Sequence, residues 1–166
     1  PPIVIAQHMP AGFTARFAAR LDELCDVKVV EAEDRMPLEA GKAYVAKGDW
    51  HLRVERSSGQ LKCRLSQDEL TSGHRPSVDV LFESVANVVG PQAVGAILTG
   101  MGRDGATGLR LMRDRGAYTV GQSQSSALVY GMPRVAFEEG AVVEQAPVEA
   151  IAMRLATALN RLKSAA

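Results

Sequence analysis

The sequence has few cysteines, few aromatic residues and no net charge. Of its 166 residues, two are cysteines and 5% are aromatic, and 19 basic side chains balance 19 acidic ones. Balanced charge argues against nucleic acid or an anionic membrane as the main partner, and few aromatics leave few surfaces on which bases could stack. No apolar run is long enough to span a membrane. We therefore expect no nucleic-acid partner and no insertion into a membrane.

The two cysteines, Cys25 and Cys63, have neither the spacing of a metal site nor that of a redox pair. Isolated thiols in a cysteine-poor chain are typical of a reducing compartment, which predicts a cytoplasmic protein in which both side chains pack in the core. The acidic residues Glu31, Glu33 and Asp34 lack companion ligands at a recognised spacing. We expect a solvated loop there.

Short apolar runs alternate with amphipathic segments along most of the chain. The apolar runs predict strands at residues 3–6, 27–30, 94–98, 117–120 and 141–144. Strands that alternate with helices predict a doubly wound, mostly parallel α/β sheet with helices on both faces. Residues 42–65 alternate around a Ser/Gly turn instead, which predicts an antiparallel hairpin appended to the edge of the sheet. The length predicts a single domain.

A glycine-rich turn follows the apolar run at residues 94–98. Gly100, Gly102 and Gly105 match G-x-G-x-x-G between a strand and a helix, the context of a dinucleotide-binding turn. Against this interpretation, Asp104 places a negative charge where a pyrophosphate would lie, and the next strand ends without an acid for a ribose. There are two other interpretations. In one, the turn only packs the helix on the strand, and in the other it carries a catalytic acid.

His8 also follows a strand, the one at residues 3–6. The carboxyl ends of strands in an open α/β sheet face one crevice, so we expect His8 and Asp104 to open onto the same crevice. Histidine is the usual general base near neutral pH, and a buried aspartate can hold its tautomer. Such a pair still needs a nucleophile, so these two residues alone leave hydrolysis open.

The other two histidines are weaker candidates. His51 lies in the hairpin with no acid beside it, which predicts a surface or packing residue. His74 precedes a helix for which Ser77 is the candidate N-cap. A histidine there could bind an anion or a substrate carboxylate, and its role stays open.

Four stretches together resemble the protein-glutamate methylesterase family of bacterial chemotaxis, the CheB-type catalytic domain. They are IVIAQHMPAGFTARFAARL, HRPSVDVLFESVA, VGAILTGMGRDGATGLRLM and ALVYGMPRVAFEEGAV, and they occur in the family's order. The resemblance implies a doubly wound α/β fold with a Ser-His-Asp triad. It implies hydrolysis of glutamate methyl esters on methyl-accepting chemotaxis receptors and, in many members, deamidation of receptor glutamines. No metal or organic cofactor is needed for that chemistry.

Carried over by motif, the resemblance assigns the base to His8 of QHMP and the orienting acid to Asp104 of GMGRDG. It assigns the oxyanion-hole donor to the backbone N–H of Met101. The family's nucleophile lies upstream of the QHMP strand in a G-x-S-T-G-G turn, a motif that this sequence does not contain.

We therefore expect residues 1–166 to be a methylesterase catalytic domain that lacks its first strand and nucleophile turn. The family's missing strand lies inside the sheet, so its loss predicts a slot with unpaired backbone groups. A regulatory receiver domain is expected elsewhere in the full-length protein. The alternative is a non-catalytic module that only binds receptors.

Overall fold

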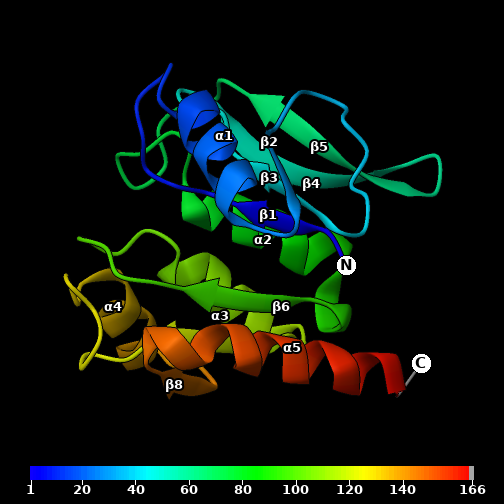
Figure 1. Cartoon of the computed structure of the whole chain (residues 1–166). Helices are drawn as coiled ribbons and strands as arrows, with labels where there is room; N and C mark the ends of the chain where they lie inside the picture. Colours follow the sequence, from blue (N-terminus) through cyan, green and yellow to red (C-terminus); the bar gives the residue numbers. More distant parts are fainter. Residues whose placement is uncertain (165–166) are drawn as a thin grey trace. The chain divides into compact units, whose positions relative to one another are not determined.

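The computed structural model describes residues 1–164 of the chain. It contains two compact units, unit 1 (Pro1–Ser84) and unit 2 (from Val85 onward). Each unit has its own three-stranded parallel sheet, and helix α2 (Val78–Val88) runs from one unit into the other (Figure 1).

Unit 1 combines a parallel sheet of strand order β1-β3-β2 with a separate antiparallel hairpin, β4-β5. Helix α1 packs on the sheet because Ala18 joins Val29, Ala43 and Val45 in one buried cluster. The elements of unit 1 before α2 are β1 (Ile3–Ile5), α1 (Thr14–Leu24), β2 (Lys28–Glu31), β3 (Lys42–Val45), β4 (His51–Ser57) and β5 (Gln60–Ser66).

The predicted hairpin exists, but it is shorter than residues 42–65. Its register runs from His51 opposite Ser66 to Ser57 opposite Gln60. Residues 42–45 instead form β3, the central strand of the parallel sheet. The consecutive burial of Ala43, Tyr44 and Val45 explains the difference, because a central parallel strand is covered on both faces and does not alternate.

Unit 2 has a parallel sheet of strand order β6-β7-β8. Val120 and Ala146 on the sheet pack against Ile151 of the last helix. The elements that follow α2 are a short 3₁₀ helix (Gly90–Gln92), β6 (Val94–Ile97), α3 (Ala106–Asp114), β7 (Tyr118–Gln122), α4 (Met132–Glu138), β8 (Glu144–Ala146) and α5 (Val148–Ser164).

The last strand lies later than the predicted residues 141–144. Ala141 closes the end of α4, because its N–H donates to the Ala136 carbonyl at 2.8 Å. The Thr119 hydroxyl donates to the Ala141 carbonyl at 2.7 Å. Ala141 and Val142 are therefore buried before the strand begins. They are apolar because the connection between α4 and β8 packs into the core.

The mixed α/β fold with mostly parallel strands and an antiparallel hairpin is confirmed. Among residues 1–164, β1 and β6 are each an edge strand of their own sheet. One side of each strand thus has no strand partner in the described part of the chain. The slot expected from a missing inner strand stays a prediction.

The cysteines differ in environment. Cys63 is buried in β5, and desolvation raises the pKa of its thiol to about 12. Cys25 is exposed just after α1, so its predicted core position is wrong.

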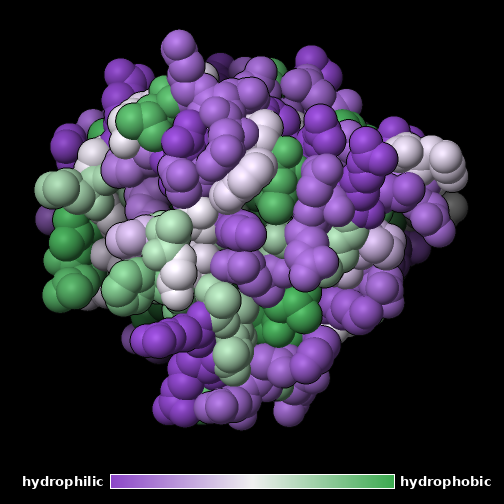
Figure 2. All heavy atoms as spheres, turned by 90° about the horizontal axis from the view of Figure 1, so that it is seen from above, coloured by the Kyte–Doolittle hydropathy of each residue, from purple (hydrophilic) through white to green (hydrophobic). Residues whose placement is uncertain are grey.

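Figure 2 shows mostly hydrophilic residues on the face it draws, with hydrophobic residues in small groups. Within residues 1–164, no helix combines the length and the apolarity needed to cross a membrane.

Candidate active site

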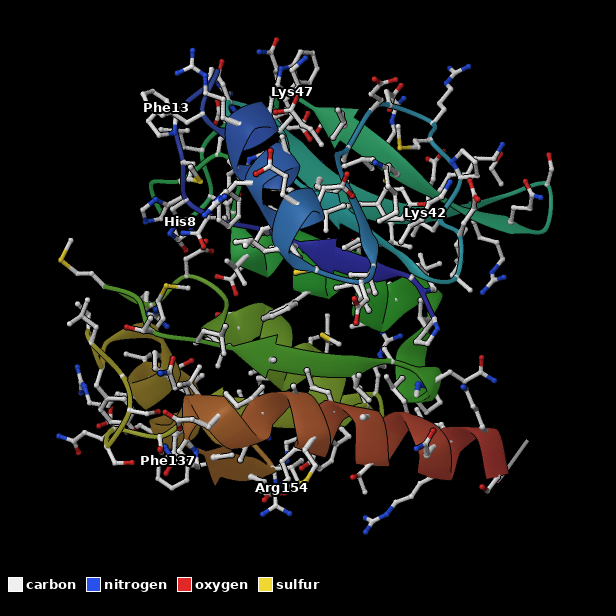
Figure 3. The ribbon with its side chains drawn as sticks, in the orientation of Figure 1. His8, Phe13, Lys42, Lys47, Phe137 and Arg154 are labelled. Atoms are coloured by element: carbon white, nitrogen blue, oxygen red, sulfur yellow. The ribbon has the colours of Figure 1, made fainter. Side chains whose placement is uncertain are left out.

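His8 lies on an irregular segment that leaves the carboxyl end of β1 (Figure 3). The end of β1 is tied to the chain after β3, because the N–H of Ala46 donates to the Ile5 carbonyl at 2.8 Å. Further along, the segment lies against Gly48, where an added Cβ would come within 2.6 Å of the Pro10 carbonyl oxygen. Only glycine allows this approach of two backbones. The segment that carries His8 is therefore held at both ends.

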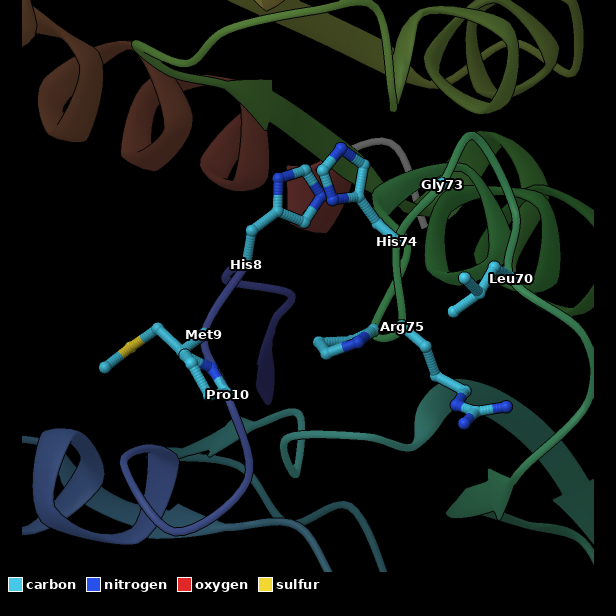
Figure 4. Close-up of a pocket in the computed structure, with 8 residues that line it drawn as sticks. His8, Met9, Pro10, Leu70, Gly73, His74 and Arg75 are labelled. Atoms are coloured by element: carbon cyan, nitrogen blue, oxygen red, sulfur yellow. The ribbon is translucent and has the colours of Figure 1, made fainter.

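The ring of His8 stacks on the ring of His74. The two ring centroids are 3.8 Å apart and the rings are inclined by 8°, so the imidazoles lie face to face (Figure 4). Both side chains are half-buried. They border a hollow of about 340 Å³ whose lining is completed by Met9, Pro10, Leu70, Gly73, Arg75 and Pro76.

His51 anchors the loop that carries His74. The backbone N–H of Ser77 donates to His51 Nδ1 at 3.2 Å, so Nδ1 must be the unprotonated nitrogen. Nε2 then carries the proton and donates to the Glu69 carbonyl at 2.9 Å. The ring is fully buried and bridges two points on either side of His74. Of the two predicted roles for His51, the structure has the packing role.

Arg75 ties the same loop from the other side. Its guanidinium donates to Asp49 Oδ1 through Nε and Nη2, at 3.1 and 2.7 Å. Nη1 donates to the carbonyls of Gln67 and Asp68, at 3.1 and 2.8 Å. Figure 4 shows the Arg75 side chain directed away from the two stacked rings. Arg75 therefore lines the hollow, while its guanidinium is bonded to the loop.

Replacing His51 with alanine is expected to lower the free energy of unfolding by about 2–4 kcal/mol. The variant leaves the Ser77 N–H and the Glu69 carbonyl without their partner, and each buried orphan costs about 1–3 kcal/mol. Urea denaturation of the chain measures the change. Glu69→Ala is the matched control, because the exposed side chain is lost while the backbone carbonyl remains. A change below about 0.5 kcal/mol for His51→Ala, the range of ordinary surface substitutions, would contradict the anchoring role.

In unit 2, Asp104 lies in the turn between β6 and α3. Gly102 and Gly105 on either side have φ of +89° and +93°, which a residue with a Cβ rarely adopts. Asp104 itself is 1% exposed, two residues before α3 begins. Met101 lies in the same turn and is 82% exposed. Within residues 1–164, the Met101 N–H donates no hydrogen bond, so it is available to an incoming oxygen atom.

The glycines of this turn pack against the loop before α4. The N–H of Gly100 donates to the Val129 carbonyl at 3.0 Å, and the N–H of Met132 donates to the Gly100 carbonyl at 2.7 Å. A Cβ on Gly131 would lie 2.6 Å from the Gly100 oxygen. The absence of a side chain at Gly131 thus lets its backbone lie against that of Gly100. The other two glycines of the motif, Gly102 and Gly105, meet the positive φ of the turn.

The residues expected from the sequence are distributed over both units. His8 lies in unit 1, and Asp104 and Met101 share one turn of unit 2. The roles of these three residues stay predictions. The single crevice expected for His8 and Asp104 stays a prediction as well. The structure adds the stack of His74 on His8. Among the described residues, no group of three or more His, Cys, Asp or Glu side chains is arranged to hold a metal ion.

Comparison with known proteins decides the family. The family model described as CheB methylesterase matches residues 1–155. The chain belongs to the CheB methylesterase family. A crystal structure of the CheB methylesterase catalytic domain of Thermotoga maritima matches with a TM-score of 0.88 and 32% identity, over 99% of this chain and 84% of that one.

Curated relatives at higher identity carry a double name. Protein-glutamate methylesterase/protein-glutamine glutaminase 1 of Caulobacter vibrioides is 64% identical over 146 residues, which are 87% of this chain and 42% of that protein. The methylesterase/glutaminase of Sulfurimonas denitrificans is 49% identical over 163 residues, which are 98% of this chain and 46% of that protein. The chain thus spans less than half the length of these relatives.

Proposed function

We propose that residues 1–166 form the catalytic domain of a protein-glutamate methylesterase. Its substrates are the methylated glutamate side chains of methyl-accepting chemotaxis receptors, and it also deamidates receptor glutamines. The reaction takes place in the cytoplasm and uses no metal or organic cofactor. The observation that carries the proposal is the family match over residues 1–155, together with the methylesterase and glutaminase names of the relatives.

The nucleophilic serine belongs to a part of the protein outside this sequence, because residues 1–166 contain no G-x-S-T-G-G turn. The curated relatives are more than twice as long as the matched stretch, which leaves room for that segment and for a regulatory receiver domain. The chain itself supplies the base, the orienting acid and the oxyanion donor.

The proposed reaction is acyl transfer in two steps. The serine hydroxyl attacks the ester carbonyl while His8 takes its proton, and His8 returns that proton to the methoxide as the C–O bond breaks. Methanol leaves and an acyl-enzyme ester remains. Water then attacks this ester with the same proton relay, which yields the glutamate carboxyl group and regenerates the serine.

Two parts of the glycine-rich turn assist these steps. Asp104 holds the ring of His8 in the required tautomer and stabilises the imidazolium. The Met101 N–H donates to the oxyanion of each tetrahedral intermediate, a contribution of about 3 kcal/mol in the transition state for a typical donor. The exposure of Met101 and the burial of Asp104 suit these two roles.

Apolar side chains around the same turn support a protein substrate. Met101, Leu128 and Val129 are 82%, 92% and 43% exposed. The two loops that carry them are adjacent, because the Gly100 N–H donates to the Val129 carbonyl. Exposed apolar groups that gather on a surface typically mark an interaction site.

Methanol release by the full-length protein tests the proposal. The protein is incubated with receptor whose glutamates carry radioactive methyl esters, and the volatile methanol is counted. We expect release, and we expect it to stop when a fluorophosphonate labels one serine per chain. Receptor retained by the protein without any methanol released would contradict the esterase and support the non-catalytic binding module.

A further inference from the structure

We propose that His74 is a positioning residue, which holds the imidazole of His8 in the orientation that proton transfer needs. The inference deepens the proposed function and rests on it for the role of His8 as base. The stack itself rests on geometry alone, with ring centroids 3.8 Å apart and an inclination of 8°.

Side-chain contacts set the orientation of the His8 ring, because the backbone around it is irregular. The segment after β1 forms neither helix nor strand at His8, and the side chain is only half-buried. The orientation of the imidazole about its two side-chain torsions therefore depends on the groups that contact it, and the His74 ring is one of them. The His74 ring lies against one face of the His8 ring. It therefore blocks the side-chain rotations that would tilt the His8 ring out of the stack.

A face-to-face stack also leaves the chemistry of His8 intact. The hydrogen-bonding positions of an imidazole, Nδ1 and Nε2, lie in the plane of the ring. The His74 ring occupies the face of His8, so it does not compete for either nitrogen. Support through the face and proton transfer through the edge can operate at the same time.

His74 is itself well placed to act as a fixed support. Thr71 and His74 exchange two backbone hydrogen bonds, of 3.2 and 2.9 Å, which close the tight turn before it. His51 bridges Glu69 and Ser77 on either side of that turn. With the guanidinium of Arg75 bonded to the same loop, this wall of the hollow is anchored at several points.

A direct role on the substrate is the competing possibility, because a histidine here could bind a substrate carboxylate. The two roles affect different kinetic constants. Loss of a substrate contact that is equal in ground and transition state raises KM, whereas loss of orientation of the base lowers kcat. An aromatic ring without nitrogens can replace a support but cannot replace a ligand.

The first experiment compares His74→Ala with His74→Phe in the full-length protein. We expect His74→Ala to lower kcat for methanol release by about 10–100-fold with KM nearly unchanged, as a small misplacement of a reacting group does. We expect His74→Phe to restore kcat to within about threefold of the wild type, because its ring retains the face contact. Glu69→Ala, on the same loop, is the control expected to keep wild-type kinetics.

Two kinetic outcomes would overturn the proposal. Wild-type kcat in His74→Ala would mean that the stack is dispensable. A rise in KM that His74→Phe does not reverse would mean that the ring binds substrate through its nitrogens.

A structural readout separates this inference from the proposed function. In nuclear magnetic resonance spectra of the full-length protein with labelled histidines, the ring protons of His8 should carry a ring-current shift. We expect the shift to disappear in His74→Ala and to persist in His74→Phe. If the wild-type protein releases no methanol, the proposed function fails while the spectra still report the stack; an unchanged spectrum in His74→Ala refutes the stack itself.

Discussion

Replacing Asp104 with asparagine is expected to lower kcat for methyl-ester hydrolysis about 10⁴-fold in the full-length protein. Asparagine has the same size, but its amide can donate where the carboxylate only accepts. It therefore favours the wrong tautomer of the base and gives no stabilisation to the imidazolium. Because Asp104 is 1% exposed, water is poorly placed to take over from the lost carboxylate.

Asp114→Asn is the matched control for this substitution. Asp114 ends α3, the helix that begins just after Asp104, and it forms an exposed pair with Arg110 at 2.8 Å. An exposed ion pair contributes about 0–1 kcal/mol, so this variant should keep wild-type kinetics. Both variants are assayed for methanol release and for thermal unfolding. A kcat within tenfold of the wild type for a folded Asp104→Asn would remove Asp104 from the proposed triad.

The sequence was most informative where a pattern is local. The apolar run at residues 94–98 became β6 (Val94–Ile97), and the alternation on either side of Ser58 and Gly59 became the β4-β5 hairpin. Ser77 also caps α2 as expected, because the Val80 N–H donates to its hydroxyl at 3.4 Å. Each of these features depends on residues within a few positions of one another.

Features that depend on distant partners were not predictable in the same way. Residues 42–45 pair with strands that begin at Ile3 and Lys28, so their place at the centre of a parallel sheet follows from partners far along the chain. The apolar Ala141 and Val142 resemble the start of a strand, yet their burial comes from packing against Thr119 and Gly121. Local periodicity cannot separate these cases.

The site shows the same division. The motifs around His8 and Asp104 made both residues candidates, because each follows a strand and lies in a distinctive string. His74 remained open because nothing in its neighbourhood points to residue 8. Its contact arises from a loop that His51 and Arg75 hold in place, and both anchors bond to backbone atoms that carry no sequence signal.

Replacing Gly131 with alanine is expected to lower kcat about 100-fold by moving the turn that carries Met101. The added Cβ would lie 2.6 Å from the Gly100 oxygen, 3.1 Å from the Gly102 nitrogen and 3.2 Å from Met101 Cα. All three are backbone atoms, so no side-chain rotation relieves the contact. The φ of Gly131 is −104°, outside the left-handed region that favours glycine, so no positive-φ strain adds to the crowding. A displacement of about 1 Å of a catalytic group is enough for a loss of this size.

Gly121→Ala separates displacement of the turn from general overpacking of unit 2. Its Cβ would lie 2.9 Å from a methyl group of Val142, so it crowds a buried side chain and no backbone atom of the turn. Both variants should lose about 1–3 kcal/mol of stability, the usual cost of an extra methyl group in a packed region. Only Gly131→Ala should lose kcat, which methanol release and thermal unfolding of both variants would measure. Equal kcat in the two variants would mean that the position of the turn does not limit the reaction, and the oxyanion role of the Met101 N–H would then have to be abandoned.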